Sequence, residues 1–197
     1  MTSMAKIRSL CVYCGSSDRG RRAHHDAALR LGRIMAKAGI RLVYGGGRIG
    51  MMGRIADAVM EGGGEVVGII PQFLEQVEVG HSGVTQLIVT DNMHDRKQKM
   101  AELSDAFLIM PGGLGTLDET FEILTWKQLG LHEKPVIIAD IGGYWHHLTE
   151  LIDHMIAESY AKPENRALFQ VIDSVDELLP TLEAMPAFEH DVEAKWL

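Results

Sequence analysis

The sequence is poor in basic residues and has no long apolar run, and both absences exclude classes of protein. It holds 19 Lys and Arg against 27 Asp and Glu, a formal net charge of -8 at pH 7. Nucleic-acid surfaces and polybasic membrane patches need clustered basic side chains, so we expect neither partner. No apolar stretch approaches the roughly 20 residues of a membrane helix, and the first residues lack the pattern of a signal peptide. We therefore expect a cytoplasmic protein.

Cysteine is also scarce. The two cysteines, Cys11 and Cys14, form a C-x-x-C pattern of the kind that can bind metal or carry out redox chemistry. They fall in an apolar run at 9–14 that resembles a strand, where positions three apart point to opposite faces of the sheet. No second pair completes a zinc site, and the nine histidines form no convincing ligand set. We therefore expect two packed thiols and no metal, with a working thiol pair as the alternative.

Short apolar runs alternate with amphipathic segments of helix length along most of the 197 residues. Strands are predicted at 9–14, 41–44, 65–70, 85–90, 105–110 and 134–140, and helices at 23–38, 51–61, 93–103, 117–129, 144–159 and 175–184. The stretch 71–84 interrupts this alternation and is predicted to be a long loop. Strands that are apolar on both faces and separated by helices indicate a mainly parallel sheet covered on both sides. The expected fold is one Rossmann-like, doubly wound α/β domain over 1–197, with 185–197 as a peripheral tail.

Two glycine clusters follow predicted strands and lead into predicted helices, at 44–53 (YGGGRIGMMG) and 111–116 (PGGLGT). In a doubly wound sheet, ligands lie outside the carboxyl ends of the strands, near the point where strand order reverses. Glycine allows close backbone approach and a helix start offers unpaired N–H donors, so a phosphate is the natural occupant. Tight turns without a ligand are the alternative, above all for Gly45, Gly46 and Gly47.

Neither cluster combines a standard nucleotide motif with the sequence context that the motif requires. The first satisfies G-x-G-x-x-G through Gly45, Gly47 and Gly50. It follows the second predicted strand rather than the first, however, and the third strand does not end in the acidic residue of an NAD site. Both clusters lack the G-K-[ST] ending of a Walker loop. The pattern therefore favours neither a stable NAD site nor a Walker loop.

Polar residues follow the second cluster directly. Thr116 can cap the predicted helix or donate its hydroxyl group to a phosphate, and Asp118 and Glu119 occupy the predicted first turn, where acids also interact favourably with the helix dipole. Glu119 could reach a sugar attached to a phosphate in the turn. Elsewhere, Arg96 and Lys97 stand near the start of a predicted helix, where they could clamp a phosphate or a base, or form an ordinary solvated face.

Five segments, in matching order, closely resemble the Lonely Guy family of cytokinin-activating phosphoribohydrolases. They are 11–17 (CVYCGSS), 42–53 (LVYGGGRIGMMG), 92–97 (NMHDRK), 110–120 (MPGGLGTLDET) and 125–135 (TWKQLGLHEKP). The pattern P-G-G-x-G-T-x-x-E is the diagnostic element. The resemblance implies hydrolysis of the N-glycosidic bond of a purine nucleoside 5'-monophosphate, such as AMP or an N6-substituted form, to free base and ribose 5-phosphate. It also implies no cofactor and a homodimer or larger homo-oligomer.

The resemblance assigns catalysis to Arg96 and Glu119. Breaking the bond develops oxocarbenium character on the ribose, which a carboxylate can stabilise while it orients or deprotonates water. Arg96 could stabilise the leaving base. The substrate-binding residues that the resemblance implies are Glu78, Arg96, Lys97, Gly112, Gly113, Leu114, Gly115, Thr116, Leu117, Asp118, Glu119 and Thr125. Many relatives have Tyr and Glu where this chain has Leu114 and Asp118.

Two other activities remain as alternatives. Relatives are often labelled "possible lysine decarboxylase", an activity that needs a pyridoxal phosphate Schiff-base lysine, whereas the lysines here are predicted to lie in polar helical segments. The second alternative is a non-catalytic carrier of a nucleotide or phosphorylated cofactor. A carrier has no obvious need for a carboxylate beside the anomeric carbon, so Glu119 favours the enzyme.

Overall fold

The protein is built around a single seven-stranded sheet. The computed structural model describes residues 7–75 and 80–185, and its strand order is β4-β3-β2-β1-β5-β6-β7, with every neighbouring pair parallel. The strands are β1 (Ser9–Tyr13), β2 (Arg41–Tyr44), β3 (Val66–Pro71), β4 (Gln86–Thr90), β5 (Ala106–Ile109), β6 (Val136–Ala139) and β7 (Gln170–Ile172). The prediction of a doubly wound α/β fold is confirmed.

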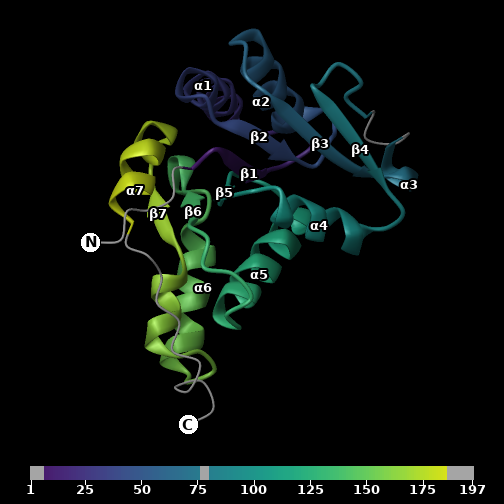
Figure 1. Cartoon of the computed structure of the whole chain (residues 1–197). Coiled ribbons are helices and arrows are strands. Elements are labelled where there is room, and N and C mark those ends of the chain that lie inside the picture. The colour runs from purple at the N-terminus through teal and green to yellow at the C-terminus, as the bar shows by residue number, and fades with distance from the viewer. Residues whose placement is uncertain (1–6, 76–79, 186–197) are drawn as a thin grey trace.

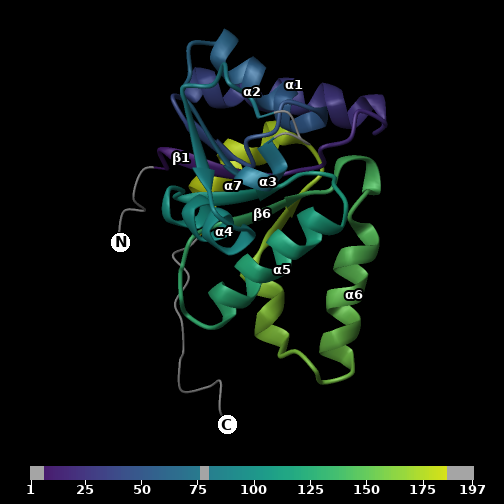
Figure 2. The same cartoon turned by 90° about the vertical axis from the view of Figure 1, so that its right-hand side faces the viewer.

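Helices cover both faces of this sheet (Figure 1, Figure 2). One face carries α1 (Arg22–Ala38), α2 (Gly50–Glu61) and α7 (Leu178–Ala184), and the other carries α4 (Met93–Glu102), α5 (Leu114–Gln128) and α6 (His146–Ala157). The shorter elements are α3 (Gln72–Glu75) and the 3-10 helices η1 (Ile141–Gly143), η2 (Pro163–Leu168) and η3 (Val175–Glu177). Within the described ranges, no helix is long and apolar enough to cross a membrane.

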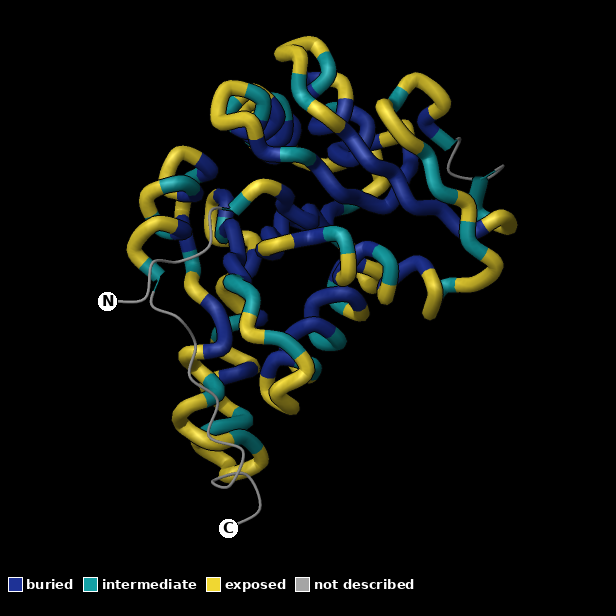
Figure 3. Tube along the Cα trace, in the orientation of Figure 1, coloured by how far each residue is buried: buried dark blue, intermediate teal, exposed yellow. Residues whose placement is uncertain are grey.

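The core consists of two apolar clusters, one on each face of the sheet. Figure 3 shows the central strands buried, whereas the edge strand β4 is largely exposed or half-buried. Cys11 belongs to the cluster under α4, α5 and α6, and Cys14 belongs to the cluster under α1 and α2. Both are buried thiols rather than a disulfide, and burial raises the pKa of Cys11. The predicted packing of the two cysteines on opposite faces is confirmed.

Helix α5 begins at Leu114, three residues earlier than predicted from Leu117. The prediction was wrong because glycine and threonine have low helix propensity, which suggested that the helix starts after them. They are tolerated in the first turn, where the N–H groups have no intrahelical acceptor. The N-cap is Gly113, in an extended conformation. Thr116 therefore lies in the first turn rather than at the cap, and Asp118 lies beyond it.

Other elements also differ from the prediction. The interval 71–84 contains the short helix α3, and the strand β7 was missed because only three residues form it. The helix predicted from Tyr144 begins at His146, because Gly142 and Gly143 take left-handed φ values of +64° and +73° and form the separate turn η1. The segment predicted at 175–184 divides into η3 and α7.

The strand order reverses between β1 and β5, which are the first strands of the two halves of the sheet. The segments that follow them are joined, since the Gly15 N–H group donates to the Pro111 carbonyl oxygen at 3.0 Å. Gly15 in turn accepts a hydrogen bond from the Met51 N–H group at 3.2 Å, which ties in the start of α2. The two predicted glycine clusters therefore meet at one edge of the sheet, where doubly wound folds bind ligands.

Candidate functional site

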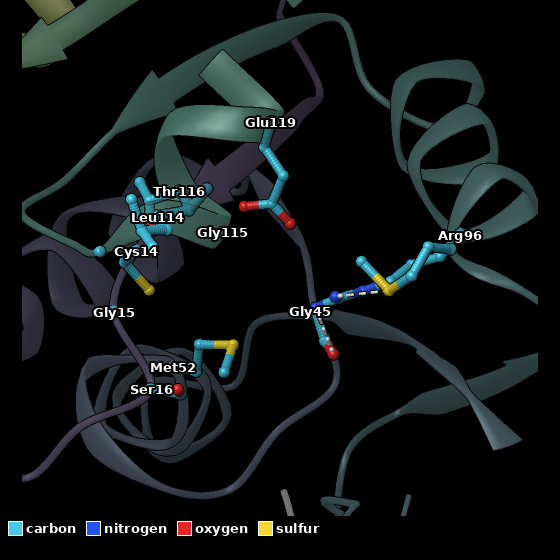
Figure 4. Close-up of a pocket in the computed structure, with 13 residues that line it drawn as sticks. Cys14, Gly15, Ser16, Gly45, Met52, Arg96, Leu114, Gly115, Thr116 and Glu119 are labelled. Carbon is cyan, nitrogen blue, oxygen red and sulfur yellow. Dashed lines mark hydrogen bonds between the residues drawn. The ribbon is translucent and has the colours of Figure 1, made fainter. Parts of the chain in front are cut away.

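A cavity of about 260 Å³ opens at this reversal of strand order. Its walls come from the ends of β1 and β2 and the starts of α2, α4 and α5 (Figure 4). The lining residues are Val12, Cys14, Gly15, Ser16, Gly45, Met52, Met93, Arg96, Gly113, Leu114, Gly115, Thr116 and Glu119. Both predicted catalytic residues, which are 23 positions apart in the sequence, therefore line the same cavity.

Glu119 stands in the second turn of α5 and is only 8% exposed. Figure 4 shows its carboxylate directed into the cavity, beyond the first turn that carries Leu114, Gly115 and Thr116. The N–H groups of that first turn have no intrahelical acceptor and lie at the positive end of the helix dipole. The cavity thus has an end whose N–H groups suit an anion and, about one helical turn away, a buried carboxylate.

The glycine at position 112 is required by packing. A Cβ atom there would lie 2.1 Å from Thr116 Oγ1, whereas one at Gly113 or Gly115 would meet nothing within 4 Å. Thr116 is itself 3% exposed, and its carbonyl oxygen accepts from the Thr120 hydroxyl group at 2.6 Å. Gly112 therefore lets the turn close on Thr116, while Gly113 and Gly115 leave open space where a ligand can approach the backbone.

Arg96 enters the cavity from α4, opposite Glu119 (Figure 4). Its side chain is buried, and its guanidinium group donates from Nε to the Ile69 carbonyl oxygen at 3.2 Å and from Nη2 to the Gly45 carbonyl oxygen at 3.1 Å. Nη1 faces the sulfur of Met93 at 3.7 Å, a weak acceptor. Two backbone carbonyls thus fix the guanidinium plane, and Nη1, whose contact is the weak Met93 acceptor, has N–H groups to donate to a stronger acceptor on a ligand.

The first glycine cluster leaves space for the Arg96 guanidinium group. Gly45 lines the cavity, and a Cβ atom there would lie 2.0 Å from Arg96 Nη2. Gly46 has a φ of +76° and packs on β3, and Gly47 forms an antiparallel bridge with Gly80. Gly46 and Gly47 therefore pack against β3 and Gly80, outside the cavity wall. Of these three glycines, Gly45 is the one that lines the cavity.

Lys97 is not part of the cavity wall and contacts α5 instead. Its ammonium group lies 3.0 Å from Asp118 Oδ2 and 3.0 Å from Glu122 Oε1. Burial lowers the pKa of Lys97, but the bonds to Glu122 and Asp118 outweigh that effect and hold the pKa above its usual value. The Lys97 side chain is only 8% exposed, so it does not belong to a solvated helix face, which was the alternative interpretation from the sequence. It is an ionic link between the helix of Arg96 and the helix of Glu119.

We predict that Lys97→Met lowers the free energy of unfolding by about 1 to 2 kcal/mol, between the values for exposed and buried ion pairs, since Glu122 is only partly exposed. Urea unfolding of the wild type, Lys97→Met, Glu122→Gln and the double variant measures this change and the coupling between the pair. Strictly additive effects would contradict an ionic link between the two helices.

The remaining predicted site residues lie around the cavity or outside the described residues. Leu117, Asp118 and Thr125 share an outer face of α5 with Phe121, Glu122 and Trp126, next to the cavity rather than in its wall. Glu78 falls in 76–79, outside the described residues.

The sequence did not assign six of the cavity residues, namely Val12, Cys14, Gly15, Ser16, Met52 and Met93. The segment CGSS after the first strand carried a usable signal, because the loop after β1 must border the reversal of strand order in this fold. The two methionines carried none, since methionine at helical spacing is typical of any core.

The prediction that the lysines lie in polar helical segments is wrong for Lys127. It is 1% exposed, and burial lowers its pKa to about 8. It stands two helical turns beyond Glu119 on α5, a rise of about 12 Å, and it is not part of the cavity wall. Over 7–75 and 80–185, no three or more His, Cys, Asp or Glu side chains are arranged to hold a metal ion.

Comparisons with known proteins identify relatives of this chain. A family model described as "Possible lysine decarboxylase" matches residues 52–182. A cytokinin riboside 5'-monophosphate phosphoribohydrolase of Arabidopsis thaliana is 40% identical over 191 residues, which cover 97% of this chain and 84% of the relative. The chain belongs to the Lonely Guy family. A second Arabidopsis member of the Lonely Guy family is 42% identical over 179 residues, covering 91% of this chain and 83% of the relative. The resemblance drawn from the motifs is confirmed.

Solved structures extend the likeness in fold beyond the Lonely Guy family. The Moco carrier protein from Chlamydomonas reinhardtii superposes with a TM-score of 0.70 at 20% identity, over 91% of this chain and 98% of that one. The molybdenum cofactor binding protein from Rippkaea orientalis gives 0.67 at 23% identity, over 92% and 98%. At these identities the similarity concerns the fold alone.

Proposed function

We propose that this protein hydrolyses the N-glycosidic bond of a purine nucleoside 5'-monophosphate and releases the free base and ribose 5-phosphate. One observation carries the proposal: Glu119 and Arg96 face each other across a cavity that ends at the glycine turn and first N–H groups of α5. A phosphate at that turn places an attached ribose near Glu119. The relatives named cytokinin riboside 5'-monophosphate phosphoribohydrolases support the same reaction.

Glu119 acts on the sugar in this proposal. As the bond between C1' and N9 breaks, positive charge develops on the ribose ring, and a largely buried carboxylate such as that of Glu119 stabilises that charge more strongly than one in water. The same carboxylate can accept a proton from the water that attacks C1'. Because Glu119 belongs to the second turn of a rigid helix, its distance from the phosphate turn is fixed.

Arg96 acts on the other side of the cleaved bond. A guanidinium group stays protonated, so it stabilises the negative charge of the departing purine rather than supplying its proton. The carbonyl oxygens of Ile69 and Gly45 hold two of its three nitrogens, which orients Nη1 without a reorganisation cost at the moment of reaction.

Neither alternative activity accounts for this arrangement. A decarboxylase needs a lysine that reaches its cofactor, whereas the buried Lys97 is paired with α5 and Lys127 lies outside the cavity wall. A carrier needs the phosphate turn but not a buried carboxylate beside the sugar. The likeness to molybdenum cofactor carriers concerns the fold and does not favour the carrier function.

The proposal predicts that the purified protein releases adenine from AMP and the substituted base from an N6-prenylated AMP, and releases far less from adenosine, which lacks the phosphate. Chromatographic separation of base and nucleotide measures all three. Carbon dioxide released from lysine on addition of pyridoxal phosphate, with AMP left intact, would instead support the decarboxylase.

We also propose that the protein forms a homodimer or larger homo-oligomer, as the family resemblance implies. The outer face of α5 supports this with the large apolar side chains of Leu117, Phe121 and Trp126 beside Thr125. A subunit packed there would stand next to the cavity, which accounts for the substrate contact implied for Thr125.

A further inference from the structure

Tyr144, which follows η1, reaches the glycine turn from behind. Its hydroxyl group donates a hydrogen bond to the Gly112 carbonyl oxygen at 2.5 Å, although the two residues are 32 positions apart. Tyr144 is outside the cavity wall and cannot be counted among the residues that touch a ligand there. Resting on the function proposed above, we propose that Tyr144 is a positioning residue that orients the peptide between Gly112 and Gly113 toward the substrate phosphate.

The geometry of a peptide bond transmits this hydrogen bond to the other side of the turn. In a planar trans peptide the C=O and N–H groups point in opposite directions. The Gly112 carbonyl group points to Tyr144, outside the cavity, so the Gly113 N–H group points to the opposite side, where Gly113 forms part of the cavity wall. A hydroxyl group outside the site thus aims an N–H donor into it.

This peptide needs an external restraint. It lies between two glycines, whose backbone rotates more freely than that of any other residue, and a side chain at Gly113 would meet nothing within 4 Å. Gly112 packs closely on Thr116, but the Gly113 side of the peptide is open, so packing there does not stop the Gly112 carbonyl oxygen from turning toward the cavity. A carbonyl oxygen there would repel a phosphate, whereas an N–H group attracts it.

Tyr144 is itself held in a rigid frame at the end of β6. The carboxylate of Asp140 accepts from the Trp145 N–H group, and the Asp140 N–H group donates to the Ile172 carbonyl oxygen on β7 at 2.8 Å. The rings of His24 and Trp145 lie edge-on to Tyr144, at centroid distances of 5.2 Å and 4.8 Å. The hydroxyl group is therefore fixed from both sides, even though the residue is 41% exposed.

The role predicts a specific kinetic signature. Tyr144→Phe removes one oxygen atom, keeps the ring contacts and leaves Glu119 and Arg96 in place. Loss of one hydrogen bond corresponds to a change of about fivefold. We expect the KM for AMP and the inhibition constant of ribose 5-phosphate each to rise about fivefold, because both ligands carry the phosphate. We expect kcat and the inhibition constant of free adenine to stay within about twofold of wild type.

Tyr160→Phe is the matched control, because Tyr160 is 90% exposed and undergoes the same chemical change. It should alter none of these constants. An inhibition constant for ribose 5-phosphate that stays within twofold of wild type in Tyr144→Phe overturns the positioning role, whatever happens to kcat. An equal rise for ribose 5-phosphate and adenine also overturns it, since a general disturbance of the cavity would act on both.

The role of Tyr144 can be tested even if the protein does not cleave AMP. If the wild type releases no base from AMP, the reaction is wrong, and titration calorimetry with orthophosphate still compares the two proteins. Weaker orthophosphate binding by Tyr144→Phe than by wild type and Tyr160→Phe would support the positioning role. Equal binding would overturn it.

Discussion

Glu119→Gln is expected to lower kcat for AMP by at least about 10³-fold, with little change in KM or in the unfolding midpoint. The amide has the size of the carboxylate but can neither stabilise positive charge on the ribose nor accept a proton from water, and general base and electrostatic contributions each reach this order. Among the described residues 7–75 and 80–185, Glu119 is also the only acidic residue in the cavity wall. Single-turnover base release measures the chemical step directly.

The matched control for this variant is Glu158→Gln, an exposed residue at the carboxyl end of α6 that should retain wild-type turnover. A Glu119→Gln protein that keeps more than about a tenth of wild-type kcat would remove this carboxylate from the mechanism. Thermal unfolding of all three proteins separates a catalytic loss from a folding defect.

Gly45→Ala is expected to lower kcat/KM by roughly 10²-fold while the fold persists. The added Cβ atom would stand 2.0 Å from Arg96 Nη2, so the guanidinium group must move and lose its bond to the Gly45 carbonyl oxygen. A flexible side-chain end can move at little cost to stability, but a displacement of about 1 Å at a catalytic group costs about this factor in rate. Activity should therefore fall much more than stability.

Gly83→Ala provides the comparison for Gly45→Ala. Its added Cβ atom would approach only the His81 ring, at 3.3 Å, away from the cavity, so turnover should be retained. Steady-state kinetics and urea unfolding are measured on both variants. Equal losses of stability and activity in Gly45→Ala would show that Gly45 is needed for the stability of the fold rather than for the position of the Arg96 guanidinium group.

The architecture was predictable because the apolar runs are short, β-branched and separated by amphipathic segments, which only a parallel sheet between helices can bury. The meeting of Glu119 with the turn at 111–116 was predictable for the same reason, since it depends on local spacing within one strand-to-helix connection. Arg96 could be placed beside them through the family motif, not through physical reasoning from its own segment.

Contacts between distant segments were not predictable from local patterns. The charge of Lys97 suggested a phosphate ligand, but its partners Asp118 and Glu122 lie on another helix and take up the ammonium group. Gly45 carried the signal of a phosphate loop, whereas its lack of a side chain makes room for Arg96. Tyr144 gave no signal at all, because its hydrogen bond to Gly112 exists only after β6 is placed beside β5.

The most direct test of the proposed hydrolysis is a chromatographic assay that quantifies free adenine and ribose 5-phosphate together after incubation of the wild-type protein with AMP. Hydrolysis of the N-glycosidic bond predicts that both products appear in equal amounts, at a rate proportional to protein concentration. It also predicts that neither appears above background with Glu119→Gln over the same interval. Intact AMP under conditions in which an active Lonely Guy relative cleaves it would contradict the proposed reaction, and equal product formation by Glu119→Gln would contradict the role of Glu119.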